Sequence, residues 1–212
     1  MEKFTKLTGV AAPLMRRNVD TDIITPMGRV VSVAREELGN YAFEPWRFNE
    51  DGSENPDFVL NRDRFRGAPI LLAGDNFGCG SSRETAVWGL WQMGIRCVIA
   101  PSFGDIFFGN CFKNGMLPIA LPAETVEDFA QQAGADKNDT LFTVDLQTCT
   151  VTAPNGDTVS FDVDPARREA LLEGLDEIDV TLRRGDEITA YQNKDRTARP
   201  WIYDLPDGLE TA

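Results

Sequence analysis

The sequence predicts an α/β fold with a small, mostly parallel sheet flanked by helices and an additional β-rich module. Between residues 68 and 133, short apolar segments alternate with segments of helical spacing in the order β-α-β-α-β-α. From residue 140 the pattern changes to the alternation of apolar and polar residues that is typical of half-buried strands. Strands separated by helices usually run parallel, so we expect ligands at the carboxyl ends of the first group of strands.

The individual elements follow from the same two periodicities. In the first group, the expected strands are residues 70–73, 96–100 and 117–121, and the expected helices are residues 83–93, 102–114 and 123–133. In the β-rich module, the expected strands are residues 141–146, 149–153 and 158–163, with a hairpin turn at Asn155-Gly156 and a last helix over residues 165–173.

The most informative segment is residues 68–86, APILLAGDNFGCGSSRETA, which reads as a strand, a glycine loop and the start of a helix. The loop and helix start contain Gly74, Gly78, Gly80, Ser81, Ser82, Arg83 and Glu84. Glycines allow a ligand to approach the backbone, and the first N–H groups of a helix lack intrahelical partners and carry its positive end. Arg83 can bind a carboxylate through two hydrogen bonds, and Ser81 or Ser82 can bind it or exchange a proton with it. The pattern therefore predicts an anion site.

A structural explanation of the same residues is equally open. Ser81 and Glu84 have the spacing of a capping box, in which the two side chains only satisfy backbone N–H groups at the helix start. Nucleotide motifs fit poorly, because no lysine follows Gly80 and the glycine spacing is not G-x-G-x-x-G.

Residue usage limits the chemistry that this chain can perform alone. The chain has no histidine, which excludes Ser-His-Asp and Cys-His nucleophile systems and imidazole-bound zinc within one chain. The four cysteines lack the spacing of a zinc or iron–sulfur site; they are Cys79, Cys97, Cys111 and Cys149. We therefore expect no metal site confined to this chain.

Composition indicates a globular chain of 212 residues with 42% hydrophobic residues and a formal charge of −13. The negative charge argues against nucleic acid and anionic membranes as partners. No apolar run approaches the roughly 20 residues of a membrane span, and the N-terminus lacks a signal-peptide pattern. We expect a cytoplasmic protein with reduced thiols.

The chain closely resembles the 3-isopropylmalate dehydratase small-subunit family of the aconitase superfamily in three motifs, which occur in the family's order. They are NVDTDII at residues 18–24, GDNFGCGSSRE at residues 74–84 and NCFKNG at residues 110–115. The similarity extends from Phe4 to about Arg184. The resemblance implies a swivelling β/β/α domain, with the N-terminal strands in the same unit. We expect a single domain over residues 1–190 and a C-terminal tail over residues 191–212 that is flexible or docked on a partner.

The resemblance also implies a hydro-lyase that interconverts 2-isopropylmalate and 3-isopropylmalate by dehydration and rehydration in leucine biosynthesis. On that basis Ser81 is the expected base and Arg83 the expected carboxylate clamp. The expected substrate-binding residues are Asp20, Thr21, Asp22, Arg29, Gly80 and Ser82.

The same resemblance implies a partner. A large subunit is expected to carry a four-iron four-sulfur cluster and to form a heterodimer or heterotetramer with this chain, which itself holds no cofactor. The small-molecule substrate is expected to be a dicarboxylate.

Two departures from the family pattern keep alternative functions open. Thr85 stands where histidine is common, and Thr25-Pro26-Met27 stands where Ile-Pro-Lys is usual. The alternatives are a related dehydratase for another 2-hydroxy diacid, of the methylated malate or homoaconitate type, and a non-catalytic module that binds an anion and regulates a partner.

Overall fold

The computed structural model describes residues 1–80, 83–135 and 140–203. The chain forms two compact units, Met1–Gly174 and Leu175–Ala212. The first unit contains the sheet and its helices. Within the described ranges, no helix is long and apolar enough to cross a membrane.

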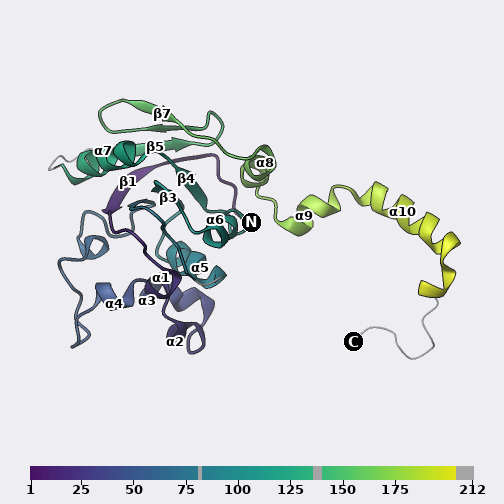
Figure 1. Ribbon diagram of the computed structural model, residues 1–212, viewed down its shortest axis with the longest axis horizontal. Coiled ribbons are helices and arrows are strands. Elements are labelled where there is room, and N and C mark those ends of the chain that lie inside the picture. The colour runs from purple at the N-terminus through teal and green to yellow at the C-terminus, as the bar shows by residue number, and fades with distance from the viewer. Residues whose placement is uncertain (81–82, 136–139, 204–212) are drawn as a thin grey trace. The chain divides into compact units, whose positions relative to one another are not determined.

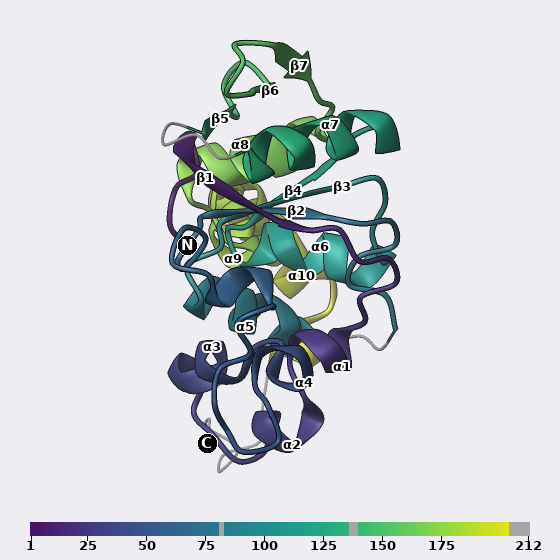
Figure 2. The ribbon, with the colours of Figure 1, turned by 90° about the vertical axis from the view of Figure 1, so that its left-hand side faces the viewer.

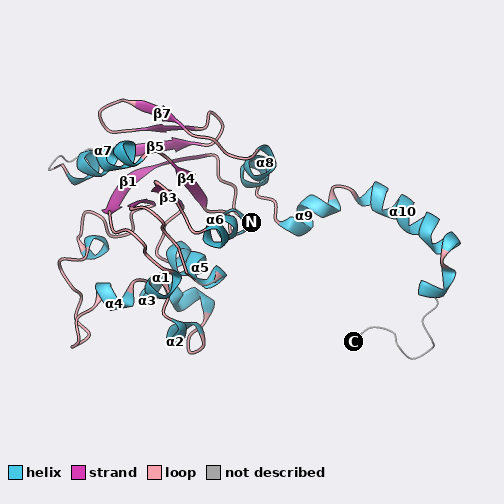
Figure 3. Cartoon of the chain, in the orientation of Figure 1, coloured by secondary structure: helices cyan, strands magenta, loops and turns pink. Residues whose placement is uncertain are grey.

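A single sheet of seven strands, in the order β4-β3-β2-β1-β5-β6-β7, organises the first unit (Figure 1, Figure 3). The parallel strands are β1 (Lys6–Leu14), β2 (Ile70–Ala73), β3 (Cys97–Ala100) and β4 (Leu117–Ala120). The antiparallel strands are β5 (Leu141–Asp145), β6 (Thr150–Thr152) and β7 (Thr158–Ser160). The prediction of a mostly parallel sheet followed by a β-rich module is confirmed.

Strand β1 joins the two halves of this sheet. Its residues 11–14 pair with β2 in parallel, whereas its residues 6–10 pair with β5 in the antiparallel direction. The β-rich module is therefore a continuation of the same sheet, and the N-terminal strand belongs to the unit as the resemblance implied.

Helices cover both faces of the parallel strands (Figure 2). Helices α5 (Glu84–Gln92) and α6 (Asp105–Lys113) lie on one face, and α7 (Ala123–Gly134) lies on the other. The strands are buried on both faces, since Leu71 packs into the core under α5 while Ile70 packs into the core under α7, both fully buried. Burial of one such side chain stabilises the fold by about 1.5–3 kcal/mol. Helix α8 (Pro165–Glu173) has the predicted bounds, and its Leu171 packs into the core that lies under α7.

Most boundaries agree with the predictions to within a single residue, and the larger differences are at the start of α6 and the end of β7. Helix α6 begins at Asp105 instead of residue 102, because the backbone before it is paired with the glycine loop: the Phe77 amide donates to the Ser102 carbonyl, and the Gly104 amide donates to the Phe77 carbonyl. Strands β6 and β7 are shorter than predicted, with three residues each. The hairpin turn is confirmed, with Gly156 at a φ of 93°.

Residues 21–61 fold into short helical pieces that periodicity does not reveal. They are α1 (Thr21–Ile24), α2 (Met27–Val30), η1 (Arg35–Glu37), α3 (Leu38–Tyr41), α4 (Glu44–Arg47) and η2 (Val59–Asn61). The α helices among them lie on the side of α5 (Figure 1, Figure 2). Arg47 stabilises this region by donating hydrogen bonds to the Gly39 carbonyl and the Asn61 side chain.

The second unit contains α9 (Glu177–Leu182), α10 (Gly185–Ala198) and η3 (Pro200–Ile202). Residue 190, where the sequence suggested that the main domain ends, lies within α10.

Candidate functional site

The glycine loop leaves the carboxyl end of β2 and leads into α5, as the sequence predicted. Ser81 and Ser82 lie outside the described residues, so their roles stay predictions. Gly78 has a φ of 71°, and a Cβ there would stand 2.2 Å from Cγ of Phe107. Both the conformation and the contact require glycine at this position.

The segment Asp20–Asp22 lies directly against this loop, although the two are far apart in the sequence. The Thr21 amide donates to the Cys79 carbonyl over 3.0 Å. Asp20 is the N-cap of α1 and accepts a hydrogen bond from the Ile23 amide over 2.8 Å. A Cβ on Gly80 would stand only 3.4 Å from Cβ of Asp20. The structure thus brings together three of the predicted substrate-binding residues and Gly80.

Arg83 stands at the start of α5 and forms an ion pair with Asp22. The Arg83 side chain is 16% exposed and the Asp22 side chain 56%. An oriented guanidinium at a helix N-terminus, where the positive end of the helix dipole adds to its charge, is well suited to bind a carboxylate. Its present counter-ion is a carboxylate of the chain itself.

The helix begins in a different register from that of a capping box. Arg83 is the N-cap of α5 and makes no side-chain capping bond, so Glu84 is the first residue of the helix instead of the third. The Glu84 carboxylate accepts a hydrogen bond from the Asn114 side chain over 2.7 Å. The capping-box explanation of Glu84 is therefore wrong. Asn114 belongs to the third family motif, which thus supports the start of α5.

The two departures from the family pattern pack against each other. The Thr25 hydroxyl, which is fully buried, donates to the carbonyl of Thr85 over 3.3 Å. Among the described residues, the buried hydroxyl of Thr85 has no hydrogen-bond partner. An unpaired buried hydroxyl is unfavourable, so the Thr85 hydroxyl, two residues after Arg83, is available to form a hydrogen bond.

The Arg29 side chain forms an ion pair with Glu44 of α4. It donates to the Glu44 carboxylate over 2.5 and 2.9 Å, and its guanidinium lies 4.3 Å from the centre of the Tyr41 ring. The hydrogen bond raises the pKa of Arg29 and lowers the pKa of Glu44. In this structure Arg29 is a partner of α4, and a role in substrate binding stays a prediction.

A second polar cluster fixes the beginning of the glycine loop and was not predicted. Ser102 donates to Asp75 over 2.5 Å and accepts from the Asn76 amide over 2.9 Å, while Arg17 pairs with Asp75 over 3.0 Å. These hydrogen bonds, that of Ser102 first, lower the pKa of Asp75. A pocket of about 820 Å³ opens beside the cluster, between the strand ends and α7. The carboxyl ends of β2 and β3 are thus cross-linked by side chains.

The cysteines are poor metal ligands in this setting. Burial raises the pKa of the Cys79, Cys97 and Cys111 thiols, which disfavours the thiolate that binds metals. In the part of the chain that the structure describes, no group of three acidic or cysteine side chains could hold a metal ion.

Comparison with known families finds three matching models. The aconitase C-terminal domain matches residues 1–124, the LeuD_N model matches residues 130–165, and the C-terminal domain of the 3-isopropylmalate dehydratase small subunit matches residues 177–204.

Curated relatives match over nearly their full length. The 3-isopropylmalate dehydratase small subunit of Rhodospirillum centenum is 56% identical over 95% of this chain and 98% of its own. The proteins of the same name from Paramagnetospirillum magneticum and Dinoroseobacter shibae are 54% and 52% identical, over 95% of this chain and all of theirs. The crystal structure of 3-isopropylmalate dehydratase from Methanocaldococcus jannaschii shares the fold, with a TM-score of 0.62 and 24% identity over 88% of this chain and 99% of that one.

Proposed function

The chain belongs to the 3-isopropylmalate dehydratase small-subunit family, and on this premise we propose that it is the small subunit of a hydro-lyase that interconverts 2-isopropylmalate and 3-isopropylmalate in leucine biosynthesis. The structural observation that most directly supports this proposal is the position of Arg83. It stands at a helix N-terminus, on a glycine loop, with its charge facing the Asp20–Asp22 segment.

The reaction requires a proton to leave a carbon beside a carboxylate while a hydroxyl leaves the neighbouring carbon. The alkene that forms then takes up water with the opposite placement of hydrogen and hydroxyl. Negative charge accumulates on the carboxylate as the proton leaves, so fixed positive charge at that carboxylate lowers the barrier. Arg83 and the N-terminal amides of α5 are suited to supply it.

In this proposal Ser81 takes the proton from carbon, two residues before Arg83 in the chain. A serine hydroxyl is a weak base, and it can serve only where its alkoxide is stabilised by nearby positive charge. Asp22 neutralises Arg83 until a substrate carboxylate arrives and competes for the same guanidinium. The proposed substrate-binding residues beside Arg83 are Gly80, Ser82, Asp20 and Thr21. Arg29 is proposed as a further substrate-binding residue at the edge of the site.

The leaving hydroxyl needs a Lewis acid that the donor set of this chain does not suit. The chain has no histidine, and its buried thiols are held protonated. Following what the family resemblance implies, we assign a four-iron four-sulfur cluster to a large subunit that forms a heterodimer or heterotetramer with this chain. A dicarboxylate would bind where the two subunits meet, and a cytoplasmic location is part of the proposal.

A reconstitution assay tests the proposal. The chain is mixed anaerobically with the cluster-loaded large subunit of the same cell. The ultraviolet absorbance of the alkene is followed as it appears from 3-isopropylmalate or methylated malates, and as it disappears on hydration of homoaconitate. We expect activity only in the mixture, with the highest kcat/KM for 3-isopropylmalate. A higher kcat/KM for another diacid would reassign the substrate. An intact complex that is silent with all of them would refute the hydro-lyase function of this chain.

A further inference from the structure

The described part of the second unit, residues 175–203 and here called the C-terminal arm, exposes an unusual amount of apolar surface. In this range no residue of α9, α10 or η3 is buried. Its exposed large apolar side chains are Ile178, Val180, Leu182, Ile188, Tyr191, Trp201 and Ile202. Trp201 is 69% exposed and Tyr191 64%. Large aromatic side chains are seldom left in water without a partner surface.

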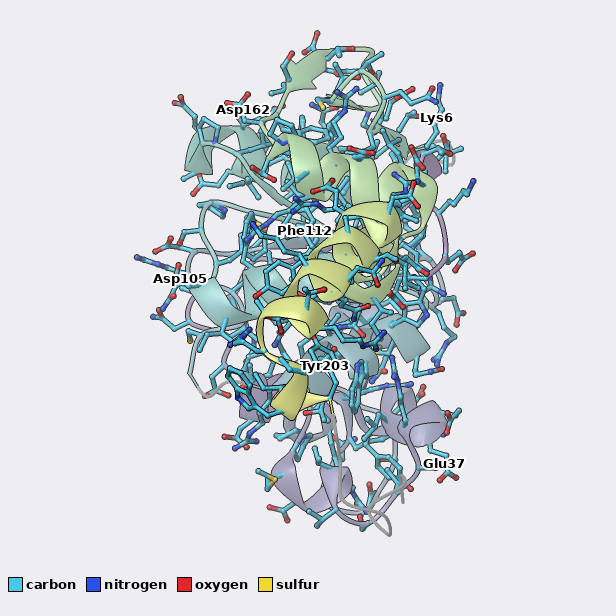
Figure 4. All side chains as sticks on the ribbon, turned by 90° about the vertical axis from the view of Figure 1, so that its right-hand side faces the viewer. Lys6, Glu37, Asp105, Phe112, Asp162 and Tyr203 are labelled. Carbon is cyan, nitrogen blue, oxygen red and sulfur yellow. The ribbon has the colours of Figure 1, made fainter. Side chains whose placement is uncertain are left out.

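Local polar contacts, instead of a core, shape the arm. Asp176 and Asp179 form a reciprocal capping box at the start of α9, with distances of 2.8 and 3.1 Å. In the last turn of α10, Asp195 accepts from Arg199 over 2.6 Å and from the Tyr203 hydroxyl over 2.9 Å, which fixes the chain just after the helix. Tyr203 is labelled in Figure 4. Such contacts stabilise a helix only marginally, because helices of this length need tertiary packing. The arm is therefore preformed in shape but has no core of its own in residues 175–203.

The exposed apolar area is sufficient for a stable interface. The two aromatic side chains each offer about 150–250 Å² when fully buried, and the aliphatic ones on the order of 100 Å². With the observed exposures of 36–69%, the arm can bury about 500 Å² of further apolar surface. One side of a standard protein interface is about 800 Å², of which roughly 60% is apolar. The arm alone matches the apolar content of one such side.

We propose that the C-terminal arm is the docking element that holds the large subunit, with Trp201, Tyr191 and Ile188 as its anchors; this rests on the proposed function. Trp and Tyr are the residue types that dominate binding energy at interfaces. A second copy of this chain is a poorer partner, because each copy carries a formal charge of −13. A separate family model covers residues 177–204, so the arm recurs among small subunits as a unit of its own.

The test measures binding of the full chain to the cluster-loaded large subunit by biolayer interferometry. Trp201→Ala and Ile188→Ala are the test variants. There are two matched controls. Gln192→Ala changes an exposed polar residue of α10, the helix that contains Ile188, and Leu141→Ala changes an apolar residue of β5 that is 49% exposed. We expect Trp201→Ala to raise the Kd at least about 30-fold and the controls to change it less than about threefold.

Two further readouts separate the possible occupants of the arm. The isolated variants should keep the Tm of the wild-type chain, and the kcat should be restored at saturating large subunit. A lowered Tm of isolated Trp201→Ala would show that the arm packs on its own chain and would overturn the proposal. A dimer of isolated wild-type chain that Trp201→Ala dissociates would overturn it in favour of a second copy.

The outcome also distinguishes this proposal from the proposed function. Wild-type binding and activity with equal Kd values for all four variants would refute the docking role alone. Absence of both binding and activity for the wild-type chain would refute the two together.

Discussion

Replacement of Arg83 by Lys provides the sharpest test of the site. The arginine stands at the N-cap of α5 with Asp22 as its counter-ion. Lysine keeps the charge but cannot form two parallel hydrogen bonds with a carboxylate. A hydrogen bond to a charged group contributes about 1.5–3 kcal/mol, so we expect kcat/KM for 3-isopropylmalate to fall about 10- to 150-fold. The fall should appear mainly as a higher KM, because the substrate carboxylate is bound in the ground state as well.

Stability should change little in the same variant. Asp22 is 56% exposed, and ion pairs exposed to solvent contribute about 0.2–1 kcal/mol. For a chain of this size that corresponds to a Tm change of no more than about 4 °C. Asp22→Asn is a comparison variant: it removes the same ion pair but leaves the guanidinium, so its kcat/KM should fall less than that of Arg83→Lys. An unchanged KM for Arg83→Lys, or equal losses of kcat/KM in both variants, would refute the carboxylate clamp and leave a structural ion pair.

Three other predictions concern the base, the loop and the ion pair of α2. Ser81→Ala should abolish turnover in the reconstituted complex while the thermal unfolding of the chain stays the same. Gly78→Ala should destabilise the chain by at least about 2 kcal/mol in thermal melts, because the new side chain meets both a positive φ and an overlap of its Cβ with Phe107. Gly134→Ala is the control, because a Cβ there meets nothing within 4 Å, and it should be neutral or stabilising by up to about 1 kcal/mol. Because pairing with Arg29 lowers the pKa of Glu44 in the folded chain, the pair stabilises the fold above the unfolded pKa of about 4.3, and this stabilisation is lost as the pH falls through the folded pKa. Glu44→Gln should therefore show a weaker loss of stability between about pH 5 and 3, measured by urea unfolding.

Each of these predictions has a contrary result. Turnover of Ser81→Ala at the wild-type rate would remove serine from the mechanism. Equal melting temperatures for the two glycine variants would mean that the loop relaxes around a Cβ. An identical acid limb for Glu44→Gln and the wild-type chain would show that the ion pair contributes nothing to folding.

The sequence predicted the central part of the fold because its elements depend on local periodicity. Helices α5 and α7 and strands β3 and β4 appear within a few residues of their predicted positions. The pairing of β1 with both β2 and β5 could not be predicted from local pattern, because register between distant strands is set by tertiary packing. The short helices of residues 21–61 are one turn long, which is too short to show a period.

The candidate site divides in the same way. The glycine loop and the helix start were visible because Gly80 and Arg83 are neighbours in the sequence. The pairing of Arg83 with Asp22, 61 residues apart, and the bond from Ser102 to Asp75 arise only when strand ends are brought together. Ser102 was assigned to a helix because its neighbours have helical spacing, and the carboxylate that engages its hydroxyl lies on a different strand end.

The shared position of β1 has a consequence for synthesis of the chain. Its first half pairs with residues 131 to 139 positions further along, from Val10 with Leu141 to Lys6 with Asp145, so a nascent chain that ends before β5 presents half of β1 as a bare edge. Folding that depends on such distant pairing is slow, and exposed edges recruit other strands. Both halves of β1 can therefore pair only after residues 141–145 have been synthesised, and a chain shortened before residue 141 should aggregate instead of forming a smaller stable sheet.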